Sequence, residues 1–176
     1  MALRDTFLRA GMKALRSAVR SRARPAGRSP QARASSQHDG ACRGDFEGAV
    51  PVEYAPQADG KADPGEVVWA WVPYEEGDGR GKDRPALVVG RDGDALLALM
   101  LTSKDHDRDA ADEARWGRSW MDIGTGAWDR RGRPSEVRLD RVLRLVPAAV
   151  RREGCHLDRA RFDEVTRELG RVRGGR

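Results

Sequence analysis

The hydrophobic residues from position 65 onward fall into short runs, and several runs alternate with a period of two, which is typical of β-strands. Val67, Trp69 and Trp71 share one face of a strand that we predict over Glu66 to Val72. The glycine-rich segment from Tyr74 to Asp83 follows this strand and is predicted to be a flexible loop of mixed charge.

The strongest local prediction is a β-hairpin. Strands are predicted over Pro85 to Arg91 and over Asp94 to Thr102, and Asp92-Gly93 between them favours a type I′ turn. The run from Ala95 to Leu101 is apolar on both faces, as expected of a central strand that is covered on two sides. The two strands are therefore expected to pair antiparallel inside the core of a sheet.

The remaining pattern predicts further short strands and one terminal helix. Asp158 is a good N-cap, and Phe162, Val165, Leu169 and Val172 fall on one helical face. Five or six short strands plus a terminal helix in about 110 residues favour a mainly β fold, a small barrel. Pro147 is expected to close the sheet, because proline cannot donate to a strand ladder. The other predicted elements are a helical turn near Ala110 to Ala114, strands over Arg118 to Ile123, Ser135 to Leu139 and Val142 to Val146, and a loop over Gly124 to Pro134.

Residues 1–34 differ from the rest of the chain in charge. They carry nine basic side chains and one acidic side chain, a net charge of +8, and since the whole chain carries +5, the other 142 residues carry −3. Any basic site outside this tail must therefore be local. The apolar residues of the tail fall on one stripe of a helix and are Leu3, Phe7, Leu8, Met12, Leu15 and Val19.

The basic tail is predicted to be a disordered or helical N-terminal extension, and its role stays open. An Arg-rich amphipathic helix could bind an anionic lipid surface, a phosphate backbone or a partner protein, and it is similar to an organellar transit peptide. It could equally be a solvated appendage without a binding role. Residues 35–63 are rich in Pro, Gly, Ser and Asp and are predicted to be a flexible linker, with Val50 to Tyr54 lying against the domain as an edge segment. The domain itself is predicted over residues 64–172.

Several classes of protein are excluded by what the sequence lacks. No apolar run approaches the roughly 20 residues that cross a bilayer, so a membrane-spanning protein is not expected. Cys42 and Cys155 lie far apart and no His or Cys pair has ligand spacing, so we expect neither a disulfide framework nor a metal site, and a reducing cytoplasm is the expected location. No phosphate-binding glycine loop, GxSxG or HExxH sequence is present, and no cofactor is expected.

Two polar clusters lie at the same end of the predicted hairpin. One ends at Arg84 before the first strand, and the other begins at Thr102 after the second, so antiparallel pairing places Arg84 near Thr102. A guanidinium beside a hydroxyl suits a phosphodiester, because the arginine neutralises charge on the phosphate oxygens and the hydroxyl donates a hydrogen bond. The alternative is an ordinary solvated rim in which Arg84 pairs with Asp83 or Asp105. Both Arg84 and Thr102 are expected to be partly buried.

The order of five pieces adds a resemblance to a known family. The pieces are Gly65-Glu66-Val67-Val68-Trp69, then Pro73, then Gly81-Lys82-Asp83-Arg84-Pro85-Ala86-Leu87-Val88-Val89, then Leu101-Thr102-Ser103-Lys104, then Glu136-Val137-Arg138-Leu139-Asp140-Arg141. This order resembles the MazF/PemK toxins of type II toxin-antitoxin systems, over roughly Pro64 to Val172. The resemblance implies an SH3-like barrel, a homodimer, a cognate antitoxin, DNA contact in complex with that antitoxin, and metal-independent cleavage of single-stranded RNA to 2′,3′-cyclic phosphate and 5′-hydroxyl ends. It also implies that Arg84 and Thr102 are catalytic.

Other residues near these two are secondary candidates. Ser103 is the second choice for holding a phosphate oxygen, and Asp105 and His106 are candidates for proton transfer, although a histidine at such a place is more often a surface residue. Trp71 and Trp120 lie inside strands and are expected to pack in the core or at an interface. The candidates for RNA binding are Arg80, Lys82, Lys104, Arg108, Arg138, Trp116 and Trp128.

Two other functions stay open. The same barrel could be a binding module without catalysis, contacting RNA, DNA or a protein tail through its basic rim, but the presence of both Arg84 and Thr102 favours an enzyme. The tail could instead make the chain an adaptor tethered to a membrane or a nucleic acid, which deletion of residues 1–34 would test. The segment Arg115 to Pro134 is longer than in the shortest family members and borders the expected RNA path.

Overall fold

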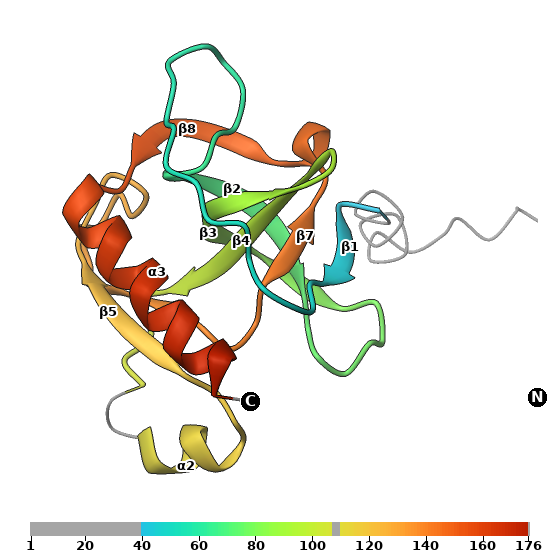
Figure 1. Ribbon diagram of the computed structural model, residues 1–176, viewed down its shortest axis with the longest axis vertical. Coiled ribbons are helices and arrows are strands. Elements are labelled where there is room, and N and C mark those ends of the chain that lie inside the picture. The colour runs from blue at the N-terminus through green and yellow to red at the C-terminus, as the bar shows by residue number, and fades with distance from the viewer. Residues whose placement is uncertain (1–39, 107–109, 176) are drawn as a thin grey trace, which may run out of the picture.

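The structure is a computed structural model that describes residues 40–106 and 110–175. The predictions for the basic tail, for residues 35–39 and for Arg108 lie outside the described residues. Within them the fold is mainly β with a C-terminal helix, as the sequence predicts (Figure 1). The elements are β1 (Cys42–Asp45), β2 (Glu66–Pro73), β3 (Gly81–Asp92), β4 (Ala95–Thr102), α2 (Ala110–Arg115), β5 (Trp120–Gly124), β6 (Ser135–Arg138), β7 (Leu143–Leu145), the 3-10 helix η2 (Pro147–Ala149), β8 (Arg151–His156) and α3 (Arg159–Gly174).

The strands form one antiparallel sheet that curls into a small barrel. Its order is β1-β7-β4-β3-β2-β8, and β6 joins β4 to β5 at the side. The first half of β4 pairs with β7, whereas its last two residues, Leu101 and Thr102, pair with Val137 and Glu136 of β6. All eight residues of β4 are buried, which confirms the prediction of a central strand. No helix among the described residues is long and apolar enough to cross a membrane.

The predicted hairpin is present, with its turn one residue further along the chain. Asp92 pairs with Ala95, so the connecting residues are Gly93 and Asp94 and not Asp92 and Gly93. Gly93 has a φ of +61°, which a glycine adopts without strain. A bulge near Gly90 interrupts the pairing, and a Cβ atom there would lie 2.1 Å from the Pro51 carbonyl oxygen, so only glycine allows this close approach.

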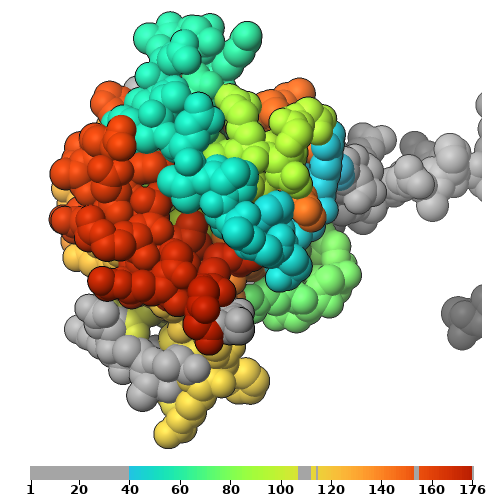
Figure 2. All heavy atoms as spheres, viewed as in Figure 1, coloured from blue at the N-terminus to red at the C-terminus, as the bar shows by residue number. Residues whose placement is uncertain are grey.

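Residues 40–63 are not the flexible linker that their composition predicts. β1 pairs with β7, and the Glu53 amide donates to the Val89 carbonyl at 3.0 Å. Phe46, Val50 and Tyr54 pack against the core, and Figure 2 shows this blue-to-teal segment lying over the barrel beside α3. The edge position predicted for Val50 to Tyr54 is confirmed, and Val52 forms an antiparallel bridge with Gly90. The packing of Phe46 and the pairing of β1 were not predicted, because the apolar residues there fill separate gaps in a surface made by other elements.

Pro147 does not close the sheet, which corrects a second prediction. It begins η2, and the chain then returns as β8 to pair with the free edge of β2. β8 shows little hydrophobic alternation because ion pairs hold it in place: Arg151 Nη2 donates to Asp83 at 2.5 Å, and Arg152 binds the buried Glu66. An edge strand of this kind carries charge where a central strand carries apolar side chains.

The core has two parts, one on each face of the central strands. α3 packs on one face with Phe162, Val165 and Leu169, and its first turn is capped by Asp158, whose Oδ1 accepts from the Arg161 amide at 3.0 Å. Both features are as predicted. Because side chains alternate along a strand, the residues that point away from α3 belong to the second face, where β2, β3 and β4 carry Val72, Ala86 and Met100.

Candidate active site

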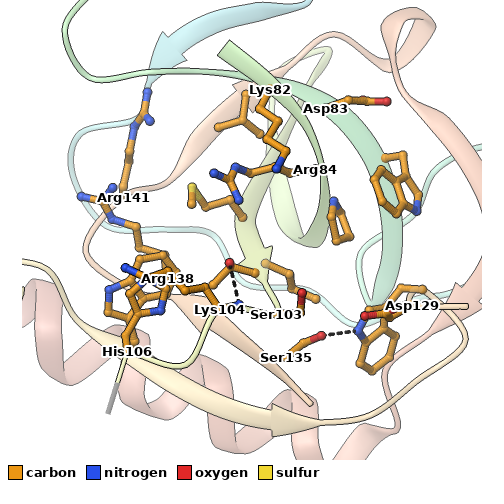
Figure 3. Close-up of a pocket in the computed structure, with 18 of the residues that line it drawn as sticks. Lys82, Asp83, Arg84, Ser103, Lys104, His106, Asp129, Ser135, Arg138 and Arg141 are labelled. Carbon is orange, nitrogen blue, oxygen red and sulfur yellow. Dashed lines mark hydrogen bonds between the residues drawn. The ribbon is translucent and has the colours of Figure 1, made fainter. Parts of the chain in front are cut away.

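A cavity of about 1040 Å³ opens on the face of the barrel that points away from α3 (Figure 3). The ends of β2, β3, β4 and β6 and the loops around residues 74–80 and 125–134 line it. Ten Lys or Arg side chains and five Asp or Glu side chains contribute to the lining, so this is a local basic site. The basic residues are Lys82, Arg84, Lys104, Arg118, Arg130, Arg131, Arg133, Arg138, Arg141 and Arg151.

Arg84 and Thr102 lie opposite each other, as the hairpin predicts. Ala86 pairs with Met100, and extending this register by two residues brings Arg84 opposite Thr102; both residues line the cavity. Asp83, one of the two expected partners of Arg84, instead binds Arg151. No residue in the described part of the chain makes a hydrogen bond or ion pair with the half-buried Arg84 guanidinium, which leaves it available to an anion. In Figure 3, Arg84 and Lys82 lie on one side of the cavity, and Ser103, Lys104 and His106 on the other.

Thr102 is more buried than expected. Only 8% of it is exposed, and its Oγ1 accepts a hydrogen bond from the Lys104 amide at 3.1 Å. This bond fixes the hydroxyl oxygen and leaves the hydroxyl proton as a donor toward the cavity. Ser103 and Lys104 follow on an exposed turn and also line the cavity.

His106 is buried, contrary to the expectation of a surface position. Only 7% of it is exposed, its Nδ1 lies 2.8 Å from Glu136 Oε2, and its backbone amide donates to Glu136 Oε1 at 3.0 Å. The ring stacks on Trp120 at 4.0 Å between centroids and 4° between planes. The ring also lines the cavity, whereas the neighbouring Asp105 is exposed and does not.

Arg138 was predicted to bind RNA, but its charge is already matched by two carboxylates. Its side chain is 8% exposed and donates to Asp140 Oδ2 at 2.7 Å and to Glu75. Desolvation would raise the pKa of Glu75, yet the hydrogen bonds and charges of Arg138 and Arg118 more than offset it and hold the pKa below its ordinary value. Arg138 therefore uses its Nε and Nη2 atoms to hold Asp140 and to anchor the loop that contains Glu75 across the cavity.

The remaining RNA-binding candidates differ in their positions. Lys82 and Lys104 are exposed and line the cavity. Arg80 pairs with Asp78, and neither Arg80 nor Trp116, which is 78% exposed, lines the cavity. Trp128 lies at the edge of the cavity, but it is 4% exposed and its Nε1 donates to Ser135 at 3.1 Å, so its ring belongs to the core and not to a stacking surface.

The sequence interpretation missed the arginines of the loop over residues 125–134. Arg130, Arg131 and Arg133 all line the cavity, and Arg133 binds Asp129 at 2.8 Å. The signal was visible as three arginines within four residues of a loop between strands. It also missed Glu136, whose role depends on which loop folds back onto it.

A metal centre has no visible ligand set in this region. Among residues 40–106 and 110–175, no group of three or more His, Cys, Asp or Glu side chains is placed to hold a metal ion.

Comparison with known proteins identifies the family. The family model described as PemK-like, MazF-like toxin of type II toxin-antitoxin system matches residues 63–172. The chain belongs to this family. The match to the MazF-like toxins includes β2, β3, β4 and β6, so it covers the strands that build the cavity and most of α3.

Solved and curated proteins add little beyond this family assignment. The crystal structure of MazE-MazF (form II) from Deinococcus radiodurans is 19% identical, with a TM-score of 0.45, and the alignment covers 69% of this chain and 98% of that one. No curated protein matches the chain.

Proposed function

We propose that this MazF-like toxin is an endoribonuclease that cleaves single-stranded RNA without a metal ion, leaving 2′,3′-cyclic phosphate and 5′-hydroxyl ends, and that a cognate antitoxin restrains it. The observation that carries the proposal is the pair Arg84 and Thr102, side by side in a basic cavity, with an arginine that no described residue neutralises. The proposal places the activity in the cytoplasm, where messenger RNA is found.

The reaction requires little covalent chemistry from the protein, because the RNA supplies its own nucleophile. The 2′-oxygen attacks the adjacent phosphorus, and the bond from phosphorus to the 5′-oxygen breaks. Arg84 stabilises the extra negative charge of the phosphorane, and the Thr102 hydroxyl donates to a non-bridging phosphate oxygen. The Lys104 amide, which donates to Thr102 Oγ1, holds that hydroxyl in place. Ser103 is the second choice for the hydrogen bond to the phosphate oxygen.

The chain also offers a path for the RNA on either side of the scissile phosphate. Lys82 and Lys104 are exposed cations at the edge of the cavity, and Arg130 and Arg131 face the same space from the loop over residues 125–134. Single-stranded RNA is bound by such cations through its phosphates and by aromatic rings through its bases. Trp69, which lines the cavity, takes the place of Trp128 as a candidate stacking residue.

The proposal is tested by incubating the purified chain with long single-stranded RNA and mapping the ends of the products. We expect discrete fragments with cyclic phosphate ends. RNA that is bound but not cut would favour the binding module without catalysis, and RNA that is neither bound nor cut would overturn both readings of the cavity.

RNA cleavage is expected to persist when divalent ions are removed. No described cluster has the ligands of a metal site. EDTA at a concentration on the order of 5 mM, enough to remove weakly bound Mg²⁺, should therefore leave the initial rate of cleavage unchanged within about twofold. The control is a metal-dependent nuclease under identical conditions. Loss of activity in EDTA with recovery on adding magnesium would contradict the proposed mechanism.

The toxin is expected to be a homodimer, as the family resemblance implies. The five tryptophans and the apolar run from Ala95 to Leu101 would also predict a dimer, because they suggest more apolar surface than a small monomer hides, but the structure does not support that second argument. The apolar residues of β4 are all buried within one chain, and among the described residues the exposed large hydrophobic side chains are Val52, Tyr74 and Trp116. Light scattering at micromolar concentration should report twice the mass of 19.4 kDa. A monomer at that concentration would contradict this prediction without affecting the proposed chemistry.

A further inference from the structure

A row of polar side chains crosses three strands on the cavity face of the sheet. The register of Ala86 with Met100, extended by two residues, brings Arg84 on β3 opposite Thr102 on β4, and Thr102 pairs with Glu136 on β6. Residues directly opposite each other in an antiparallel sheet point to the same face, with their Cβ atoms about 5 Å apart. The sheet register therefore places Glu136 next to the two candidate catalytic residues.

Glu136 extends this row to His106. Its two carboxylate oxygens are both engaged by that residue, one by the backbone amide at 3.0 Å and the other by Nδ1 at 2.8 Å. A carboxylate can only accept, so Nδ1 carries the proton, and the other ring nitrogen, Nε2, has a free electron pair in the neutral ring. Stacking on Trp120 holds the plane of the ring, and no described residue makes a hydrogen bond to Nε2.

We propose that His106 is the general base of the cleavage reaction and that Glu136 positions it, an inference that rests on the proposed function. Nε2 of His106 takes the proton of the 2′-hydroxyl as the 2′-oxygen forms its bond to phosphorus. The bond from phosphorus to the 5′-oxygen breaks, and the 5′-oxygen takes a proton from a water molecule. The hydroxide left by that water is neutralised by the proton that His106 then releases, so the enzyme returns to its starting state.

Four other titratable groups, Glu136, Glu113, Asp105 and His156, fit this role less well. Glu136 has both oxygens occupied, and Glu113 accepts from the Trp120 indole at 3.2 Å and pairs with Arg118 at 3.6 Å. Asp105 does not line the cavity. His156 is exposed at the end of β8 and also lies outside the cavity lining. His106 alone among the described histidines combines a fixed ring, a carboxylate partner and access to the cavity.

The test compares two variants of His106 with a matched histidine control in single-turnover cleavage of RNA. His106→Ala is expected to lower the rate on the order of 100-fold, the usual contribution of a general base, with RNA affinity unchanged. Free imidazole in the buffer should restore part of that rate, because the alanine leaves a cavity beside Trp120. His156→Ala should keep the wild-type rate, and Glu136→Gln should lose less than His106→Ala.

His106→Gln guards against a purely structural explanation. Glutamine keeps a planar side chain that can donate to Glu136 but has no basic nitrogen, so we expect a similar loss of rate with little change in thermal midpoint. A folded glutamine variant that cleaves at the wild-type rate, or a folded alanine variant that imidazole does not rescue, would overturn the role of His106. If the His106 tests failed while the wild-type protein cleaved RNA and Arg84→Ala abolished cleavage, the role of His106 would be wrong and the proposed function would stand. A wild-type protein without activity would overturn both the proposed function and the role of His106.

Discussion

Arg84→Ala is expected to lower the rate of RNA cleavage by about 100- to 1000-fold while the barrel stays folded. The guanidinium makes a contact that strengthens as the phosphorane gains charge, so its loss resembles the loss of one donor from an oxyanion hole. No described carboxylate pairs with Arg84, so the substitution leaves no buried charge without a partner. The free energy of unfolding should therefore change by about 1 kcal/mol or less, and the thermal midpoint by a few degrees at most.

The measurement is a single-turnover rate at saturating protein, combined with a thermal melt of the same preparation. Lys82→Ala is the matched control, because Lys82 precedes Arg84 by two residues on the same face of β3 and is exposed. It should weaken binding and reduce its salt dependence without changing the saturated rate. Thr102→Ala should lose somewhat less than Arg84→Ala. A folded Arg84→Ala variant with full activity would remove the catalytic role, and an unfolded one would make Arg84 structural.

The sequence predicted the parts of the fold that local signals determine. The β3-β4 hairpin follows from a turn dipeptide between apolar runs, and α3 follows from an N-cap and one apolar face. β8 and β1 were missed, and the contacts of Tyr54 were not specified, because their positions depend on tertiary partners. β8 is held to β2 by backbone pairing and by arginines that meet carboxylates from distant segments, and Tyr54 donates to the Leu157 carbonyl, 103 residues away, at 2.9 Å.

The candidate site, like the fold, was predictable from the sequence only where local signals determine it. Strand pairing alone brings Arg84 to Thr102, so the sequence was sufficient for that pair. The burial of His106 and the anchoring of Glu75 depend on how two loops fold over the cavity, which no local pattern encodes. The Arg138 ion pair is an exception, because Asp140 stands only two residues away in the chain, just after the end of β6.

Arg138→Met is expected to destabilise the fold by about 3 to 5 kcal/mol, which is the usual cost of leaving one member of a buried ion pair without its partner. Asp140 is 7% exposed and would keep its charge without the guanidinium that compensates it. Glu75 would also lose its anchor, which frees the loop beside the cavity. The thermal midpoint should fall by roughly 10 °C or more for a domain of this size. The rate of cleavage at about 25 °C should fall only as far as the fraction of folded protein falls.

The control is the double variant Arg138→Met with Asp140→Asn. It removes both charges of the pair, and the asparagine oxygen can still accept from the Ser119 amide, which bonds to Asp140 at 2.8 Å in the wild type. Most of the lost stability should return, because the penalty comes from the unpaired carboxylate and not from the missing arginine. Arg138→Met with an unchanged midpoint and weaker RNA binding would show instead that Arg138 acts on the substrate, as its position in the sequence first suggested.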